Sequence, residues 1–299
     1  MFGIVFRREF IGLAACLVVL LAACLLTLAF GTDGLKEGAV ASSSESPPTV
    51  SGAPTVDFIA AALRNQASAS IEAKYSLSDW LKYHYIRTPE ALSMTRTFET
   101  NGEVIQSSYD FGSRENRRLS TQTDGTLVGR VETWLGDPFV NLDCLDGALF
   151  VLPWGEEGPR PLSEWVLSGQ VLPDQEDVDG HRCWRVEVSK PIKGMDRYSV
   201  WVDPHAGFCP RRIEIASPER TGPTVIKFLD YKELAAGIWF PMKQVNEIPT
   251  EKEDEKHTSI RTVSEATAGK TFLKDSLLVK FPSGTKLYVN QGTEPVTVP

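Results

Sequence analysis

The chain has 299 residues, of which 42% are hydrophobic and 23% are charged, so it is long and apolar enough to bury a full core. Its formal net charge at pH 7 is −8. Because phosphate is negative too, and no basic cluster stands out along the sequence, the charge argues against binding to nucleic acid.

The first thirty residues differ in kind from the rest. Arg7 and Arg8 precede an uncharged apolar run, residues 10–30, which is long enough to span a bilayer core of about 30 Å. The arginines favour a cytoplasmic N-terminus, so we predict an extracytoplasmic protein anchored to the inner membrane on its periplasmic face. Two alternatives stay open: cleavage of this segment as a signal peptide, which would secrete the protein to the periplasm, and lipidation of Cys24.

Residues 31–56 are rich in Ser, Pro and Gly, which predicts a disordered linker, and residues 57–299 are predicted to form one domain. Three cysteines lie in that domain: Cys144, Cys183 and Cys209. An odd number leaves at least one thiol unpaired. The last two fall on strands separated by a third, a spacing of about 9.5 Å that exceeds disulfide reach, so no structural disulfide is predicted.

The domain is expected to open with one short amphipathic helix capped by Asp57. Alternating residues then predict a long strand over residues 71–85. Two hairpins follow. The first pairs residues 92–100 with 103–111 around an Asn-Gly turn, and the second pairs residues 117–122 with 126–135.

From Gly136 the alternation is lost and aromatic residues accumulate, which indicates a cap over the sheet. Within it, Leu162, Trp165 and Val166 fit one face of a short helix. A meander follows over residues 178–245. Each of its strands has one apolar side and one mostly charged side, so this sheet must cover one face and leave the other to water.

In total, the sequence predicts about ten or eleven strands and two or three short helices, and therefore a mainly β (α+β) fold. So few helices cannot cover one face of so wide a sheet. We therefore expect the antiparallel sheet to curl into an unclosed half-barrel plugged by the helices, with room for an acyl chain or lipid inside. The alternative, that the aromatic residues simply fill a core beneath a long loop, has similar weight.

Several segments carry a resemblance to a known family. The opening helix, sheet and plug are followed by DGHRCWRVEV, YSVWVDPHAGFCPRRIEI and GIWFPMKQV, and the chain closes with VKFPSGTKLY. Over residues 57–288 this pattern resembles the LolA/LolB-like superfamily of bacterial envelope proteins, which includes lipoprotein carriers and RseB-type sensors. The resemblance implies an apolar concavity for lipid-linked partners and no catalytic residues. The carriers are released into the periplasm, whereas this chain is predicted to be tethered.

The sequence shows no pattern typical of an enzyme site. The four histidines are scattered, no Gly-x-Ser-x-Gly or phosphate-binding glycine loop occurs, and Asp203 before Pro204 is read as a turn. We predict no catalytic residue, metal or cofactor, and keep a hydrolase as a minor alternative. The expected ligand-binding residues of the concavity and cap are Trp134, Phe139, Leu145, Phe150, Leu152, Trp154, Trp165, Val166, Trp184, Tyr198 and Val200.

The sequence thus predicts a non-enzymatic binding protein that accommodates lipid or a lipidated protein in a hydrophobic concavity. The alternative is an RseB-like sensor or protein-interaction module of the cell envelope that carries no lipid. The two differ in whether the space under the cap holds a guest or only the protein's own side chains.

Overall fold

The computed structural model describes residues 52–133, 146–147, 151–152, 160–188, 197–217, 222–250, 255–290 and 294–299. The chain divides into two units, Met1–Pro47 and Pro48–Pro299, and all the described residues lie in the second. In the part that is described, no helix is long and apolar enough to cross a membrane. The predicted anchor at residues 10–30 and most of the predicted linker lie outside the described residues.

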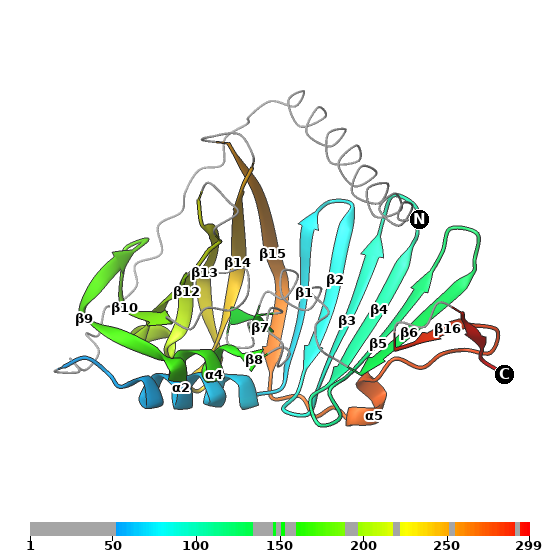
Figure 1. The fold of residues 1–299 in the computed structure, drawn as a ribbon, viewed down its shortest axis with the longest axis horizontal. Helices are drawn as coiled ribbons and strands as arrows, with labels where there is room; N and C mark the ends of the chain where they lie inside the picture. The colour runs from blue at the N-terminus through cyan, green and yellow to red at the C-terminus, as the bar shows by residue number, and fades with distance from the viewer. Residues whose placement is uncertain are drawn as a thin grey trace, which may run out of the picture. The chain divides into compact units, whose positions relative to one another are not determined.

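Fifteen of the described strands form one mainly antiparallel sheet (Figure 1). Its order from one edge to the other is β17-β16-β6-β5-β4-β3-β2-β1-β15-β14-β13-β12-β11-β10-β9. The first half comprises β1 (Ile71–Ser78), β2 (Leu81–Arg87), β3 (Ala91–Phe98), β4 (Val104–Asp110), β5 (Glu115–Thr121), β6 (Leu127–Thr133), β16 (Lys286–Val289) and β17 (Val296–Thr297). The second half comprises β9 (Gly169–Val178), β10 (His181–Val188), β11 (Arg197–Asp203), β12 (Cys209–Ala216), β13 (Thr224–Ala235), β14 (Ile238–Pro249) and β15 (Lys256–Ala268).

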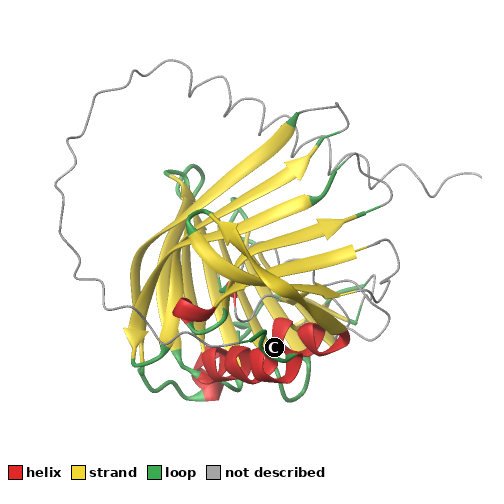
Figure 2. Cartoon of the chain, turned by 90° about the vertical axis from the view of Figure 1, so that its left-hand side faces the viewer, coloured by secondary structure: helices red, strands yellow, loops and turns green. Residues whose placement is uncertain are grey.

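The two halves meet at a single ladder, in which β1 pairs antiparallel with β15. The sheet curls (Figure 2). It remains unclosed, because its two edge strands, β17 and β9, do not pair with each other. β16 adds to β6 in parallel, although it follows β6 by about 150 residues of chain. A mainly β, curled and open sheet is therefore the fold, as the sequence predicts.

A few short helices accompany the sheet. They are α2 (Val56–Ser68), α4 (Leu162–Trp165), the 3₁₀ turns η2 (Val166–Ser168) and η3 (Pro204–Ala206), and α5 (Lys274–Leu277). A separate two-stranded sheet pairs β7 (Val151–Leu152) with β8 (Arg160–Pro161). α4 and η2 form where Leu162, Trp165 and Val166 were predicted to share a helical face, and all three are buried.

Three local predictions need correction. The cap of α2 is Thr55, whose hydroxyl accepts a hydrogen bond from Phe58 N at 3.2 Å, and Asp57 instead lies in the first turn. The predicted long strand over residues 71–85 is the β1–β2 hairpin. Finally, the closing stretch LLVKFPSGTKLY, residues 277–288, is typical of two strands joined by a turn at residues 282–284, but the stretch before Pro282 is α5 and an extended segment, and only the residues after the turn form a strand.

Two buried apolar clusters share one face of the sheet, which we call the inner face. The helix-covered cluster joins α2, α4 and η2 to β10–β13; its buried residues are Ile59, Ala60, Leu63, Leu162, Trp165, Val166, Trp184, Val186, Val188, Tyr198, Val200, Val202, Phe208, Ile213, Ile226 and Phe228. The tyrosine cluster lies mainly on β1–β3; its buried residues are Ile71, Ala73, Tyr75, Leu81, Tyr83, Tyr85, Leu92, Met94, Phe240 and Val263. Phe228 lies opposite Gln244, and Gln244 opposite Arg261, so polar residues separate the clusters.

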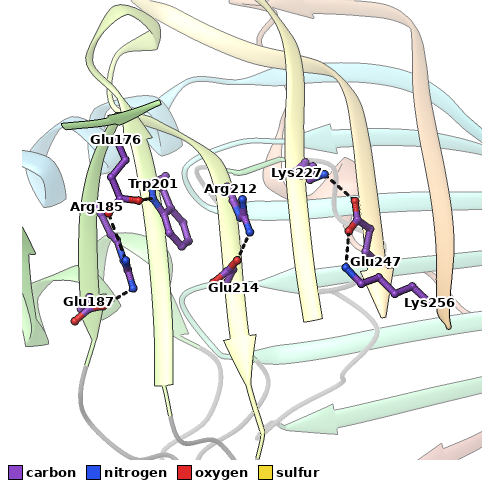
Figure 3. A network of polar contacts seen from close by, with 9 residues as sticks. All are labelled: Glu176, Arg185, Glu187, Trp201, Arg212, Glu214, Lys227, Glu247 and Lys256. Atoms are coloured by element: carbon purple, nitrogen blue, oxygen red, sulfur yellow. Dashed lines mark hydrogen bonds and ion pairs between the residues drawn. The ribbon is translucent and has the colours of Figure 1, made fainter. Parts of the chain in front are cut away.

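The opposite, outer face of β9–β15 is charged, as the alternation of the meander predicts. Figure 3 shows its network, in which Trp201 lies between two arginines. The guanidinium groups of Arg185 and Arg212 lie 4.9 and 5.1 Å from the centre of the Trp201 ring, and Trp201 Nε1 donates to Glu176 at 2.7 Å. These contacts leave the indole only 5% exposed on a face made of charges.

At the other end of the sheet the outer face also holds buried apolar residues such as Leu119, and it is covered. Residues 272–285, which we call the C-terminal strap, lie over β4–β6: Val279 N donates to Ser108 Oγ at 2.8 Å. A Cβ added at Gly129 would lie 2.7 Å from the ring of Phe281, so a glycine is needed for this close approach. The face of the sheet that holds apolar core thus changes between the two ends.

Candidate functional site

The inner face is the candidate site, and the structure brings five predicted ligand-binding residues together there. Trp165, Val166, Trp184, Tyr198 and Val200 all belong to the helix-covered cluster and are at most 7% exposed. They pack against residues of α2, so the protein's own helix occupies this part of the face. Their role as ligand contacts stays a prediction.

The other six predicted residues lie outside what the structure describes at side-chain level. These are Trp134, Phe139, Leu145, Phe150, Leu152 and Trp154; of them only Leu152 has a described backbone, in β7. Asp146 and Gly147 are the described residues of the neighbouring stretch, and they lie against the inner face at Tyr85 and Tyr231 respectively. At least this part of the predicted cap therefore enters the concavity.

Tyr198 carries a polar group into the helix-covered cluster. Its side chain is 4% exposed, and its hydroxyl has no hydrogen-bond partner among the described residues. Burial raises the pKa of this hydroxyl well above its usual value of 10, so it stays protonated and able to donate. A buried hydroxyl without a partner is costly, and a guest that accepts a hydrogen bond would remove that cost.

A pocket of about 400 Å³ lies where the two halves of the sheet meet, at the ends of β1, β2, β14 and β15. Its walls come from four connections: the link from α2 to β1, the β2–β3 turn, the β13–β14 turn and the segment after β15. The lining residues are Ala69, Ser70, Thr88, Pro89, Glu90, Ala235, Ile238, Ala268, Gly269, Lys270, Thr271 and Phe272. Of these, Ala69, Ile238 and Ala268 also pack against the tyrosine cluster, so the pocket opens at its border.

Backbone hydrogen bonds hold these walls in place. Gly269 N donates to Ser70 O at 3.0 Å, and Thr88 N donates to Ala91 O at 2.9 Å. The Thr88 hydroxyl also accepts from the backbone N–H groups of Glu90 and Ala91. Hydrogen bonds thus hold three of the four walls: the link from α2 to β1, the β2–β3 turn and the segment after β15.

A buried polar hub underlies the same seam. Arg87, 1% exposed, donates to Gln66 O in the last turn of α2 at 2.8 Å and to the O atom of its C-cap, Ala69, at 3.2 Å. It also forms a 2.5 Å ion pair with Asp146. An arginine at this position donates hydrogen bonds to the carbonyl groups that a helix leaves unpaired at its C-terminus, and its positive charge is favourable at the negative end of the helix dipole. Tyr85 donates to the same carboxylate at 3.2 Å. The hub therefore fixes α2, β2 and residue 146 to one another.

Gln66 extends the hub to the β13–β14 hairpin. Its side-chain amide donates to Gly237 O at 2.7 Å and accepts from Trp239 N at 2.9 Å. Gln66, Arg87 and Asp146 are not among the residues predicted from the sequence. Arg87 could have been found, because it continues the inward alternation of the β2 residues before it and is the one charge at such a position in that strand.

Asp203 and the described cysteines, Cys183 and Cys209, are buried in the fold. Asp203 accepts from His205 N and from Arg211 Nε, both at 2.8 Å, and is fully buried in the turn that the sequence predicts. Cys183 and Cys209 are free, buried thiols on β10 and β12. Burial, with the charge of Asp203, raises the pKa of Cys183 to about 12, which keeps it from forming the nucleophilic thiolate. Among the described residues, no group of three or more His, Cys, Asp or Glu side chains could hold a metal ion.

No protein-family model matches the chain, and no curated protein matches its sequence. In structure it is similar to a lipoprotein-sorting protein domain from Vibrio parahaemolyticus, at 10% identity and a TM-score of 0.45, over 74% of this chain and 95% of that one. It is similar to a LolA superfamily protein from Nitrosomonas europaea, at 14% identity and a TM-score of 0.34, over 76% and 99%. MucB is similar at 11% identity and a TM-score of 0.25, over 80% and 65%. These similarities concern the fold alone.

Proposed function

We propose that this protein is a non-enzymatic, extracytoplasmic binding protein that accommodates the acyl chain of a lipid or lipidated protein on the inner face of its sheet. The predicted N-terminal anchor would hold it to the periplasmic face of the inner membrane. The guest would enter through the pocket at the seam and lie against the tyrosine cluster.

The observation that carries this proposal is the composition of the two clusters. The helix-covered cluster contains buried residues of α2, α4 and η2, whereas every buried member of the tyrosine cluster comes from a strand. A pocket of about 400 Å³, within the usual range for ligand sites, adjoins only the second cluster through Ala69, Ile238 and Ala268. An acyl chain of about fourteen carbons would gain roughly 11 kcal/mol from burial before the costs of binding.

Native mass spectrometry after expression in a lipid-containing host tests the proposal, together with uptake of a fluorescent fatty acid. We expect a co-purifying hydrophobic ligand and saturable uptake. Ile238→Asp, which places a charge in the pocket wall, should reduce uptake at least tenfold. Ile260→Asp is the matched control, because Ile260 lies on β15 with 43% of its surface exposed, and it should leave uptake unchanged. A clean apo mass and no uptake by the wild type would refute the proposal.

A sensor or protein-interaction module is the second candidate, because the protein's own helices pack over the helix-covered cluster. In that case Trp165→Ala lowers the melting temperature while fatty-acid uptake is absent in the wild type and in the variant alike. Capture by the immobilised domain of one defined envelope protein, lost when the outer-face residue Arg185 is replaced, would support this function instead.

A further inference from the structure

The inner face becomes cationic toward the β16 edge. Pairing across the strands aligns one residue from each of six neighbouring strands in what we call the cross-strand row: Tyr85, Met94, Ser107, Arg118, Arg130 and Tyr288. The row begins in the tyrosine cluster and passes through two arginines to Tyr288. It therefore changes from apolar to positive along one line of side chains on the inner face.

Arg118 and Arg130 lie directly opposite each other on β5 and β6. Like charges at such positions are close enough to destabilise a sheet. The Arg130 guanidinium lies 5.7 Å from the centre of the Tyr288 ring, which holds it in place over the strand edge. Arg96, which is 8% exposed, lies on the same face, opposite Ile105. β6 also contributes one acidic residue to this face, Glu132, beside Arg118 and Arg130. Positive charge is thus concentrated here in a chain whose formal net charge is −8.

A second feature of the row points to a ligand. Ser107, directly opposite Arg118, is 6% exposed, and its hydroxyl has no hydrogen-bond partner in the part of the chain that the structure describes. A buried hydroxyl of this kind normally has a partner. It lies between the apolar residue Met94 and the arginines, where the polar head of an amphiphile would meet its apolar chain.

We propose that Arg118, Arg130 and Ser107 bind the phosphate of an anionic lipid whose acyl chain lies along the row toward Met94 and Tyr85. The inference rests on the proposed function and names the lipid class. The planar guanidinium forks of Arg118 and Arg130 match the oxygens of a phosphate group. Met94 and Arg118 are two strand spacings apart, about 9.6 Å, so the head and the first part of the chain of one lipid reach both.

The test compares two fluorescent lipids with identical acyl chains, phosphatidylglycerol and phosphatidylcholine, titrated into the full-length protein. The wild type should bind the anionic lipid at least tenfold more tightly. Arg118→Gln with Arg130→Gln should remove this preference and change phosphatidylcholine binding less than twofold. Arg117→Gln is the matched control, because Arg117 is adjacent on β5 but points to the outer face and pairs with Glu115 at 2.5 Å; it should keep the preference.

The outcomes separate this inference from the proposed function. Equal binding of both lipids by the wild type overturns the inference while the function stands, and binding of neither lipid overturns the function. Full displacement of lipid by 10 mM inorganic phosphate would overturn the assignment to a lipid, and weak or no displacement supports it. If a polyglutamate peptide binds through the arginines more tightly than either lipid, an acidic protein segment replaces the lipid as the partner. Arg130→Gln alone, at an exposed side chain, gives the same readouts should the double variant fold poorly.

Discussion

The two ends of the sheet use opposite faces for their cores. At β10–β13, apolar side chains point to the inner face beneath α2 and α4, and charges such as Arg185 and Arg212 face outward. At β4–β6, arginines lie on the inner face, while Leu119 and Gly129 lie on the outer face beneath the C-terminal strap. The inner face of one curled sheet can therefore be buried core at one end and carry positive charge at the other.

The largest expected effect tests the helix-covered end. Phe228 is fully buried in that cluster, and Phe228→Ala should lower the free energy of unfolding by about 3–5 kcal/mol because it removes apolar contacts and leaves a cavity. Urea denaturation followed by circular dichroism measures this. Ile260→Ala, at an exposed position of β15, is the control and should change stability little. A small effect of Phe228→Ala would show that this end is not a tight core.

Leu119→Ala tests whether the outer face is core at the other end. Leu119 is 7% exposed, and its loss should cost about 2–3 kcal/mol of unfolding free energy. The matched outer-face change at the helix-covered end is Lys227→Ala, which breaks the 2.8 Å ion pair with Glu247 and should cost at most about 1 kcal/mol. Equal costs at the two positions would contradict the change of face.

The pH dependence of unfolding tests the strap. Burial raises the pKa of Asp110, but hydrogen bonds from Lys274, Ser113 and Gly112 together outweigh it and bring the pKa down to about 2. Because the folded pKa is below the unfolded one, Asp110 adds stability that is present above about pH 4 and is lost as the pH falls from 4 to 2. We expect about 1 kcal/mol, allowing for solvent screening of its pair with Lys274.

Asp110→Asn should flatten this part of the pH profile, measured as the urea midpoint at pH 2, 3 and 4. The Lys274→Met variant should raise the pKa of Asp110 and shift the loss of stability to higher pH. Identical profiles for the wild type and both variants would show that the ion pair does not hold the strap.

The smallest expected effect has the opposite sign. Ser107→Ala removes a buried hydroxyl that has no partner in the described residues, so the ligand-free protein should gain about 0.5–1 kcal/mol in unfolding free energy. Thermal denaturation without and with lipid measures it. A marked loss of stability would mean that the Ser107 hydroxyl has a hydrogen-bond partner in the ligand-free protein. This part of the inner face would then be ordinary core in which the polar groups are hydrogen-bonded.

Strand alternation predicts the fold from the sequence well, but it cannot show register. The meander was recognised because its apolar and charged residues alternate, and Asn101-Gly102 marked the β3–β4 hairpin. The β1–β2 hairpin was missed because its turn, Asp79-Trp80, has two residues, which leaves the alternation of 71, 73 and 75 in phase with 81, 83 and 85.

The candidate site was harder to predict for the same reason. Arg118 and Arg130 are twelve residues apart in the sequence and become neighbours only through the β5–β6 pairing, so no basic cluster is visible along the chain. Asp146 forms an ion pair with Arg87, which lies 59 residues earlier in the chain, and no local sequence pattern predicts such a contact. Trp184, Tyr198 and Val200 of the meander lie on its apolar side, as predicted, but whether helices or a guest cover them depends on tertiary packing.

The joining of β1 to β15 and of β6 to β16 has a consequence for biosynthesis. A ribosome that has made the first six strands has produced a meander with both edges open, and the strands that close them are still unmade. Open edges pair readily with other chains, and ladders between distant segments form slowly. The nascent protein is therefore most prone to aggregation during this interval, and a chaperone that shields β1 and β6 would raise the yield of folded molecules.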